Sequence, residues 1–304
     1  MSNETNLLTI VIPAYGESPY LDQCISSIVN SQGASVEIIV IDDASPSTFV
    51  RNISEKYFPR VSYLRNEKNL GVANNFNKAL STANSLFVQI VGQDDMIINS
   101  MVEVIHSANN YAEECFAIHP AVTVIDGLGN SSFGMNEVVK SIIKPHSKMA
   151  YSGDTLRRRL LFGNWTYFPS IIWNKKLLPE APFSDEYKYC MDLDLLLRMC
   201  VTDSSLFLSE KKGFHYRRHR DSVSMAAVPK KRFEEEMSVI RKHRRNSINE
   251  RIFFGLGFLP LLNMCISKIK QVCSHVKVLL RKFMNILTKS GKDAINHSEH
   301  YKSN

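Results

Sequence analysis

The chain has 304 residues, of which 44% are hydrophobic and 22% charged, proportions that are ordinary for a globular protein with a large core. It has no run of about 18 apolar residues and no basic N-terminal segment followed by an apolar one, so the sequence predicts neither a transmembrane helix nor a secretory signal. The net charge of +7 is unevenly distributed along the chain. Residues 230–304 hold 16 Lys and Arg against 6 Asp and Glu, a net +10, which suggests an anionic partner for this tail.

Apolar, β-rich runs alternate with segments of helical periodicity as far as about residue 126. The expected strands cover 7–12, 36–41, 61–64, 86–91 and 116–125, and the expected helices cover 19–29, a segment ending near 57, 72–83 and 101–108. This alternation predicts an α/β fold with a mostly parallel central sheet and helices on both faces. In such sheets ligands bind outside the carboxyl ends of the strands.

Polar clusters follow three of these expected strands. Residues 13–17 follow the first strand, Asp42-Asp43 the second and Asp94-Asp95 the fourth, so we expect them to converge on one cleft. Adjacent carboxylates repel each other, and Mg²⁺ or Mn²⁺ bridging them to substrate phosphates would relieve that repulsion. The alternative for Asp94-Asp95 is structural: one carboxylate caps the next helix and the other is solvated.

The second half of the chain is less regular. Helices are expected at 156–162 and 191–201, strands at 170–173 and 214–217, and a charge-dense helix, solvated on most sides, at 230–246. Residues 264–287 carry an apolar stripe opposite a row of Lys and Arg, a pattern typical of a helix lying on an anionic membrane surface. A helix packed on the catalytic domain is the alternative, whereas nucleic-acid binding would leave the stripe unexplained. Residues 288–304 are predicted to be disordered.

Four motifs, in this order and spacing, resemble those of family 2 glycosyltransferases with the GT-A fold. They are Thr9-Ile10-Val11-Ile12-Pro13-Ala14-Tyr15, Val40-Ile41-Asp42-Asp43-Ala44-Ser45, residues 69–77 and Gln93-Asp94-Asp95. The resemblance covers about residues 7–225. It implies a GT-A domain at 1–228, with a Rossmann-like nucleotide-sugar-binding half at 7–126 and an acceptor half at 127–228, followed by a basic helical extension at 229–287.

The resemblance assigns residues to the site that would bind the nucleotide-sugar donor. Pro13, Tyr15 and Glu17 would shape the nucleoside pocket, and Asp43 would accept a hydrogen bond from uracil or a similar base. Asp94 would contact the ribose or the sugar, and Asp95 would bind Mg²⁺ or Mn²⁺.

The chain departs from the family pattern at two places near this site. Gly92 stands where many members carry an acidic residue, and Asn74-Asn75 stands where many have Ala-Arg.

The acceptor side is predicted from residues 189–198, which resemble the family's Glu-Asp element with Met191 in place of Glu. An inverting transfer needs a base that takes the proton of the acceptor hydroxyl, and a carboxylate within hydrogen-bond reach can do this. Asp192 matches the base position. Asp194 points about 200° around the helix and is the reserve candidate. The structural alternative is that Asp192 is the N-cap of a helix at 193–201.

A third cluster, at residues 215–224, resembles the family's Tyr-Arg-x-His-x-x-Ser-x-Ser ending. His219 would be a further metal ligand or a diphosphate contact, and Arg217 or Arg218 would neutralise phosphate charge.

The resemblance and the basic tail together predict an inverting glycosyltransferase. It would move a sugar from a nucleotide diphosphate sugar, with UDP the commonest implication, to a hydroxyl of a lipid-linked saccharide. The enzyme would be cytoplasmic and peripheral on the inner face of the cell membrane, and the resemblance implies O-antigen or capsule-type polysaccharide synthesis. A catalytically impaired nucleotide-sugar-binding protein, motivated by Gly92 and Met191, is one alternative. A nucleotidyltransferase is another, although residues 13–17 lack the cation that it would need.

Overall fold

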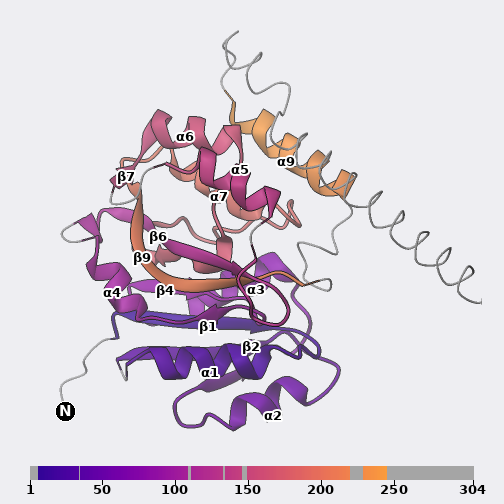
Figure 1. The fold of residues 1–304 in the computed structure, drawn as a ribbon. Helices are drawn as coiled ribbons and strands as arrows, with labels where there is room; N and C mark the ends of the chain where they lie inside the picture. Colours follow the sequence, from indigo (N-terminus) through magenta and orange to yellow (C-terminus); the bar gives the residue numbers. More distant parts are fainter. Residues whose placement is uncertain are drawn as a thin grey trace, which may run out of the picture.

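The computed structural model describes residues 6–33, 35–108, 111–132, 134–145, 149–219 and 229–244. Their centre is a nine-stranded sheet with the order β3-β2-β1-β4-β8-β6-β9-β5, and β7 pairs with β9 (Figure 1). The α/β fold predicted from the alternating pattern is therefore confirmed.

The first half is a β/α unit of parallel strands. Its elements are β1 (Leu8–Ala14), α1 (Leu21–Ser31), β2 (Val36–Asp42), α2 (Phe49–Glu55), β3 (Ser62–Arg65), α3 (Val72–Thr82) and β4 (Phe87–Ile90). β1 lies between β2 and β4 and pairs in parallel with both. β1 and β4 are almost wholly buried, which explains why both read as continuous apolar runs.

The second half extends the sheet with strands of mixed direction. Its strands are β5 (Met96–Ile97), β6 (Cys115–Ile125), β7 (Met149–Tyr151), β8 (Ile172–Asn174) and β9 (Ser205–Arg217). β6 and β9 are parallel, whereas β8 pairs antiparallel with both β4 and β6, and β5 and β7 pair antiparallel with β9. The sheet is thus mostly parallel, as expected, because β1–β4 and the long β6–β9 pair are parallel, whereas the short strands β5, β7 and β8 are antiparallel to their neighbours. The antiparallel strands have two or three residues each, too few to give a periodic signal in the sequence.

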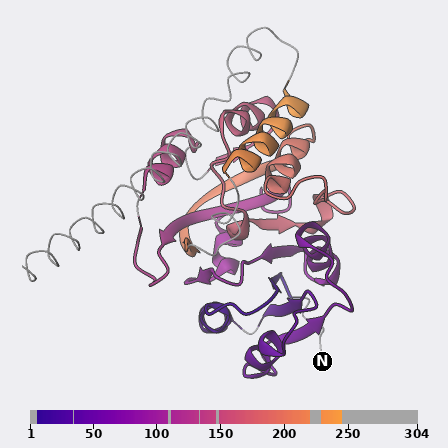
Figure 2. The same ribbon diagram turned by 90° about the vertical axis from the view of Figure 1, so that its right-hand side faces the viewer.

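The helices cover both faces of the sheet. Those of the second half are α4 (Met101–His106), α5 (Met135–Ile143), α6 (Gly153–Phe162), α7 (Met191–Met199) and α9 (Pro229–His243), with short 3₁₀ turns η2 (Phe168–Ser170) and η3 (Lys175–Leu177). One hydrophobic core joins the sheet to α1, α2 and α4, and the other joins it to α3, α6, α7 and α9. α9 lies at the opposite end of the molecule from α1 and α2 (Figure 1 and Figure 2).

Two predicted helix positions are corrected by the structure. α1 begins at Leu21 with Tyr20 as N-cap, not at Pro19. α7 begins at Met191 with Cys190 as N-cap, so Asp192 lies inside the first turn and is not the cap.

The charge-dense helix α9 is less solvated than expected. Met237, Val239 and Ile240 are buried in the core that also contains α7, and Phe233 packs against that core. Residues 233, 237 and 240 recur at helical spacing and form a narrow apolar stripe within the charged sequence. The expected helix at 264–287 and the expected disorder at 288–304 lie outside the described residues. Within the described part of the chain, no helix is both long and apolar enough to cross a membrane.

Candidate active site

Three loops meet at the carboxyl ends of β1, β2 and β4. The backbone N–H of Asp43, after β2, donates to the Ala14 carbonyl at the end of β1 (2.8 Å). The amide Nε2 of Gln93, after β4, donates to the Tyr15 carbonyl (3.3 Å). The predicted convergence of the three polar clusters is therefore observed, and parallel pairing of the three strands is its cause.

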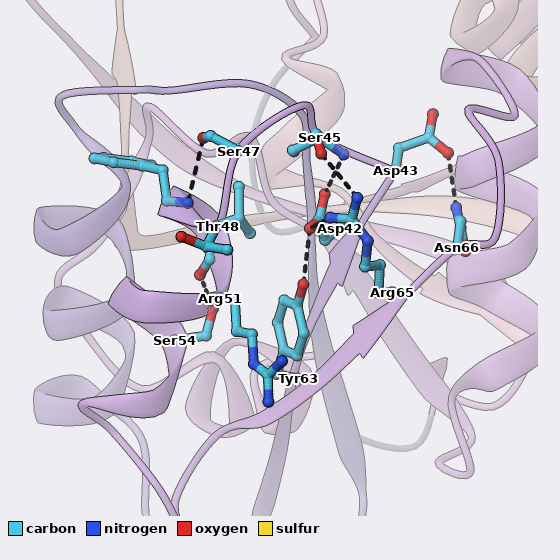
Figure 3. A network of polar contacts seen from close by, with 12 residues as sticks. Asp42, Asp43, Ser45, Ser47, Thr48, Arg51, Ser54, Tyr63, Arg65 and Asn66 are labelled. Carbon is cyan, nitrogen blue, oxygen red and sulfur yellow. Dashed lines mark hydrogen bonds and ion pairs between the residues drawn. The ribbon is translucent and has the colours of Figure 1, made fainter.

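Asp42 holds the loop after β2 in shape (Figure 3). Its carboxylate accepts hydrogen bonds from Ser45 N–H (2.8 Å), Tyr63 Oη (2.8 Å) and Arg65 Nη1 (2.5 Å). Burial alone would raise the pKa of Asp42, but these hydrogen bonds outweigh burial and lower the pKa. Ser45 Oγ in turn accepts the N–H of Gly16, which lies in the loop after β1 (3.0 Å). Asp42 therefore has a structural role in the loop after β2.

Asp43, the predicted base-contacting residue, is buried and hydrogen-bonded. Its Oδ1 accepts from Asn66 Nδ2 (2.7 Å) and from the N–H of Leu70 (2.8 Å), and its Oδ2 accepts from the N–H of Gly71 (3.1 Å). Gly71 has φ = 77°, a conformation that glycine adopts without strain. Asn66 also donates to Asn75 Oδ1 (3.0 Å). Residues 69–77 belong to a recognised motif, but nothing in the sequence pointed to Asn66.

The other predicted nucleoside contacts lie at the surface of the same edge. Pro13 is half-buried in β1, Tyr15 is 54% exposed, and Glu17 is exposed. The side chains of Tyr15 and Glu17 are therefore accessible to a ligand above the ends of β1 and β2.

The two carboxylates after β4 have different environments. Asp95 is 1% exposed and accepts a hydrogen bond from the backbone N–H of Arg217 (2.8 Å). Burial, together with the negative charge of Asp94, raises the pKa of Asp95 well above its usual value. Asp94 is half-buried, and its Oδ2 lies 2.8 Å from Nε2 of His219. The structure thus pairs His219 with Asp94, and Asp95 lies beneath them.

Gly92 provides the space that these carboxylates occupy. A Cβ atom at this position would lie 2.8 Å from Asp94 Oδ1 and 2.8 Å from Asp95 Oδ2, closer than real Cβ contacts. Where many family members carry an acidic residue, this chain therefore has the residue that lets two carboxylates fold back over the backbone.

We predict that Gly92→Ala weakens by about tenfold the Mn²⁺-dependent UDP binding that the resemblance implies, because the added methyl group would displace one or both carboxylates. Gly33→Ala is the matched control, since its nearest neighbour to an added Cβ is Ser35 Oγ at 4.0 Å. Calorimetric titration measures both. Wild-type affinity in Gly92→Ala would contradict the proposed role of this glycine.

Arg217 joins the donor site to the loop after β6. The residue is 2% exposed, and its Nε donates to the Asp94 carbonyl (2.7 Å). Its other guanidinium nitrogens donate to the carbonyls of Asp126 and Gly127 and to Gln23 Oε1. Every nitrogen of the guanidinium group therefore already has a protein acceptor. This geometry gives Arg217 the role of a buried clamp, in contrast with the phosphate contact expected from the sequence.

The side chains at this site fit a divalent cation that is coordinated partly by the protein and partly by a diphosphate. Asp94, Asp95 and His219 bring two carboxylates and one imidazole to one edge of the sheet. Among the described residues, no three His, Cys, Asp or Glu side chains form a complete metal site. Mg²⁺ is commonly held by one or two carboxylates with substrate phosphates completing its coordination, and the residues present fit that arrangement.

Asp192 has the environment expected of a general base. It lies in the first turn of α7 and is partly exposed, and its Oδ2 accepts a hydrogen bond from Asn164 Nδ2 (2.9 Å). Burial raises the pKa of Asp192, which strengthens the carboxylate as a proton acceptor. Neighbouring Met191 is buried in the core, so the departure from Glu at this position adds packing on α7.

Asp194, the reserve candidate, is occupied elsewhere. It is 1% exposed, its Oδ2 accepts from Arg198 Nε (2.8 Å), and its Oδ1 lies 2.8 Å from His243 Nε2 and 3.2 Å from Lys242 Nζ. Burial would raise the pKa of Asp194, but the hydrogen bonds from His243 and Arg198 outweigh it and lower the pKa strongly. The geometry therefore favours Asp192 as the base.

A group of cationic and aromatic side chains lies between the expected donor and acceptor sides of the site. Lys140 Nζ, on α5, donates to the Thr166 carbonyl (2.6 Å) and lies 3.9 Å from the ring centroid of Tyr167. Burial, with the positive charge of Arg218, lowers the pKa of Lys140 to about 7. Arg218 Nη1 forms an ion pair with Glu137 Oε1 (2.6 Å), so the guanidinium group expected at the phosphates faces α5 instead.

His119 supports the loop that carries Asn164 and Tyr167. Its Nδ1 lies 2.7 Å from the Pro120 carbonyl, which can only accept, so Nδ1 carries the proton and Nε2 accepts the N–H of Tyr167 (3.1 Å). Burial lowers the pKa of His119 to about 3 and keeps the ring neutral. Neither His119 nor Asn164 had a signal in the sequence, because their contacts with Tyr167 and Asp192, respectively, join residues distant in the chain.

The comparisons with known proteins agree with this geometry. Residues 9–110 match the family model described as glycosyl transferase family 2. An uncharacterized glycosyltransferase of Methanocaldococcus jannaschii is 21% identical over 262 residues, covering 84% of this chain and 87% of that protein. A chondroitin synthase of Escherichia coli is 25% identical over 196 residues, covering 64% of this chain. The chain spans only 26% of the length of that synthase, and 31% of a Mycobacterium tuberculosis relative that is 30% identical over 99 residues.

Two kinds of solved structure share the fold. TarS of Staphylococcus aureus, in complex with UDP-GlcNAc, has a TM-score of 0.57 at 19% identity, covering 79% of this chain and 67% of that one. A mannosyltransferase of Pyrobaculum calidifontis, in complex with GDP-Man and Mn²⁺, has a TM-score of 0.57 at 12% identity, covering 82% and 68%.

The chain therefore has the GT-A fold of these solved glycosyltransferase structures. All four sequence motifs lie within residues 9–110, the segment that matches the family 2 glycosyltransferase model.

Proposed function

We propose that this protein is an inverting glycosyltransferase that moves a sugar from a UDP-sugar to a hydroxyl of a saccharide acceptor. The observation that carries the proposal is the arrangement of three carboxylates. Asp94 and Asp95 lie together at the donor edge, and Asp192 is a partly exposed carboxylate on the acceptor side. Tyr216, beside the clamp residue Arg217, lies 5.1 Å from Tyr167 between their ring centroids and connects the two sides.

The residues of the chain have separate tasks in the transfer. Asp43 and the exposed side chains of Tyr15 and Glu17 would bind the nucleoside. Asp192 would accept the proton of the acceptor hydroxyl as its oxygen attacks the anomeric carbon from the face opposite the diphosphate. The bond from the anomeric carbon to the diphosphate breaks as the new glycosidic bond forms, so the configuration inverts. Asn164 would keep Asp192 oriented through its hydrogen bond of 2.9 Å.

Asp94 and Asp95 would hold the Mg²⁺ or Mn²⁺ ion together with the diphosphate of the donor, and His219 would orient Asp94 through their 2.8 Å contact. When bound, the ion would neutralise negative charge on the leaving diphosphate. The solved mannosyltransferase that shares this fold contains Mn²⁺.

The acceptor is proposed to be a lipid-linked saccharide in surface-polysaccharide synthesis of the O-antigen or capsule type. One relative, WcaA of Escherichia coli K12, is named for colanic acid biosynthesis and is 22% identical over 244 residues, covering 78% of this chain and 81% of that protein. The strongly basic sequence after residue 229 supports a location on the inner face of the cell membrane, with residues 252–287 on anionic lipid. In this proposal, residues 1–228 are the catalytic domain and 229–287 a helical extension.

A calorimetric titration of UDP with and without Mn²⁺ tests the donor site. For wild type we expect Mn²⁺ to raise the UDP affinity by about tenfold or more, a gain of about 1.4 kcal/mol or more. Asp95→Ala and Asp94→Ala should each abolish this gain, because each removes a carboxylate from the cation. Asp203→Ala, an exposed carboxylate beyond α7, is the control and should keep it.

Two results would contradict the proposed donor. If UDP affinity does not change with Mn²⁺ or with either substitution, no cation at these carboxylates takes part in donor binding. GDP binding under conditions where UDP does not bind would show that the donor nucleotide is GDP.

A further inference from the structure

Helix α9 contacts the start of α7, the helix that carries the proposed base. Oε1 of Glu235, on α9, accepts hydrogen bonds from the backbone N–H groups of Tyr189 (2.5 Å) and Cys190 (2.7 Å). These two residues lead directly into α7, which begins at Met191. One carboxylate oxygen of α9 therefore holds the chain at the point where it enters α7.

The start of α7 does not have a cap of the ordinary kind. An N-cap residue normally has an extended backbone and a side-chain oxygen that accepts an N–H of the first turn. Cys190 instead has φ = −123° and ψ = 22°, and among the described residues its thiol caps no N–H group. A helix N-terminus carries a partial positive charge, which a nearby carboxylate stabilises. Glu235 supplies that carboxylate from another element.

Asp192 lies two residues beyond this contact, inside the first turn of α7. The turn is closed by the N–H of Asp194, which donates to the Cys190 carbonyl (3.0 Å). Glu235 thus holds the residue on which this turn closes, while Asn164 holds the carboxylate of Asp192 (2.9 Å). Because a misplacement of about 1 Å can lower a rate by about 100-fold, the position of this turn matters for a base.

Helix α9 is itself fixed in place, so Glu235 can act as a support. Met237 and Ile240 of α9 are buried in the core that also contains α7. At the far end of α9, Lys242 Nζ lies 3.2 Å from Oδ1 of Asp194. Glu235 and Lys242 are about two helical turns apart, so α9 contacts α7 at two separate points.

We propose that Glu235 is a positioning residue for the transfer reaction. It fixes the first turn of α7 so that Asp192 is in place to accept the proton of the acceptor hydroxyl, and it does not touch the substrate itself. The acceptor side of the site then depends on α9, which lies outside residues 9–110 matched by the family model. This inference rests on the proposed glycosyltransferase function.

Sugar transfer by Glu235→Leu and Glu235→Gln tests this role. Leucine has no hydrogen-bond acceptor, whereas glutamine keeps an oxygen that can accept both N–H groups. Transfer is measured with UDP-glucose, UDP-galactose or UDP-N-acetylglucosamine as donor and the p-nitrophenyl glycosides of the same three sugars as acceptor probes. For Glu235→Leu we expect kcat to fall about tenfold or more while the Kd for UDP stays at the wild-type value. Glu235→Gln should keep kcat within about threefold of wild type.

Two controls separate this effect from the general docking of α9. Lys242→Met removes a contact at the far end of α9, and Glu234→Gln changes an exposed carboxylate on α9 that lies 3.8 Å from Lys230. Both should keep the wild-type kcat. A wild-type kcat in Glu235→Leu, or an equal fall of kcat in Lys242→Met or Glu235→Gln, would overturn the inference and leave the glycosyltransferase function intact.

A second measurement needs neither donor nor acceptor. Amide hydrogen exchange of the full-length chain is followed by mass spectrometry on peptides that span residues 187–195. We expect faster exchange in Glu235→Leu, because two N–H groups lose their acceptor and the first turn of α7 opens more often. Glu235→Gln and Lys242→Met should exchange as wild type does.

The two measurements distinguish failure of the inference from failure of the proposed function. Unchanged exchange in Glu235→Leu would show that Glu235 does not hold the start of α7 and would overturn the inference. If wild type transfers to none of the probes, the proposed function is contradicted, and the inference falls with it even where exchange shows that Glu235 holds α7.

Discussion

Replacing Asp192 with Asn is expected to lower kcat by about 100- to 10,000-fold, the range that a general base contributes. Asparagine keeps the size of the side chain and can still contact Asn164, but it cannot take a proton from the acceptor hydroxyl. The affinity for UDP should remain unchanged, since the side chain of Asp192 is hydrogen-bonded to Asn164, away from the residues proposed to bind the nucleotide. Measurement of sugar transfer at saturating donor and calorimetric titration of UDP separate the two effects.

The pH dependence of wild type provides a second readout of this base. Transfer needs the ionised carboxylate, so kcat should fall as the pH drops through the pKa of Asp192. Because burial raises that pKa, the acidic limb should lie above the pH at which an ordinary aspartate titrates. Asp203→Asn, an exposed control, should keep both kcat and the profile. If the Asp192→Asn variant has the kcat of wild type, the base is another residue.

Replacing Arg217 with Met is expected to lower the free energy of unfolding by about 3–5 kcal/mol. Methionine fills a similar volume but leaves the carbonyls of Asp94, Asp126 and Gly127 without their donor. It also removes the positive charge that partly compensates the buried carboxylate of Asp95. Urea unfolding followed by circular dichroism measures the loss.

The same variant should lose Mn²⁺-dependent UDP binding, because Arg217 fixes the loop that carries Asp94. Arg51→Met is the matched control. Arg51 pairs with Glu55 on an exposed helix face, where ion pairs contribute little, so stability should change only slightly. Equal stability of Arg217→Met and wild type would show that the buried clamp is dispensable.

The sequence by itself determined the first half of the fold. Apolar runs separated by helical periodicity identified β1, β2, β4 and the helices between them, because a parallel strand and an amphipathic helix each leave a pattern within a few residues of chain. The positions of the acidic clusters followed from the same pattern, since the carboxyl ends of parallel strands share one edge. Of the short antiparallel strands, β8 was predicted approximately, at 170–173, whereas β5 and β7 left no such pattern and were missed.

The resemblance placed the base at Asp192 with Asp194 in reserve, but no local pattern showed which of the two carboxylates pairs with cationic side chains. The partners that separate these two residues are distant: His243 is 49 residues from Asp194, and Asn164 is 28 residues from Asp192. The packing of α9 against α7 brings His243 to Asp194, and no local pattern in the sequence encodes that contact.

Only the tertiary structure determined how the donor-site acids differ. His219 pairs with Asp94 across 125 residues of chain, and the backbone of Arg217 holds Asp95 across 122. Burial, hydrogen-bond partners and pKa values depend on which distant segments pack together, whereas periodicity depends on neighbours in the chain. Sequence therefore identified the carboxylates proposed for this site but not Asn66, His119 or Asn164, and long-range packing decided which carboxylates are buried, which are paired and which remain accessible to a substrate.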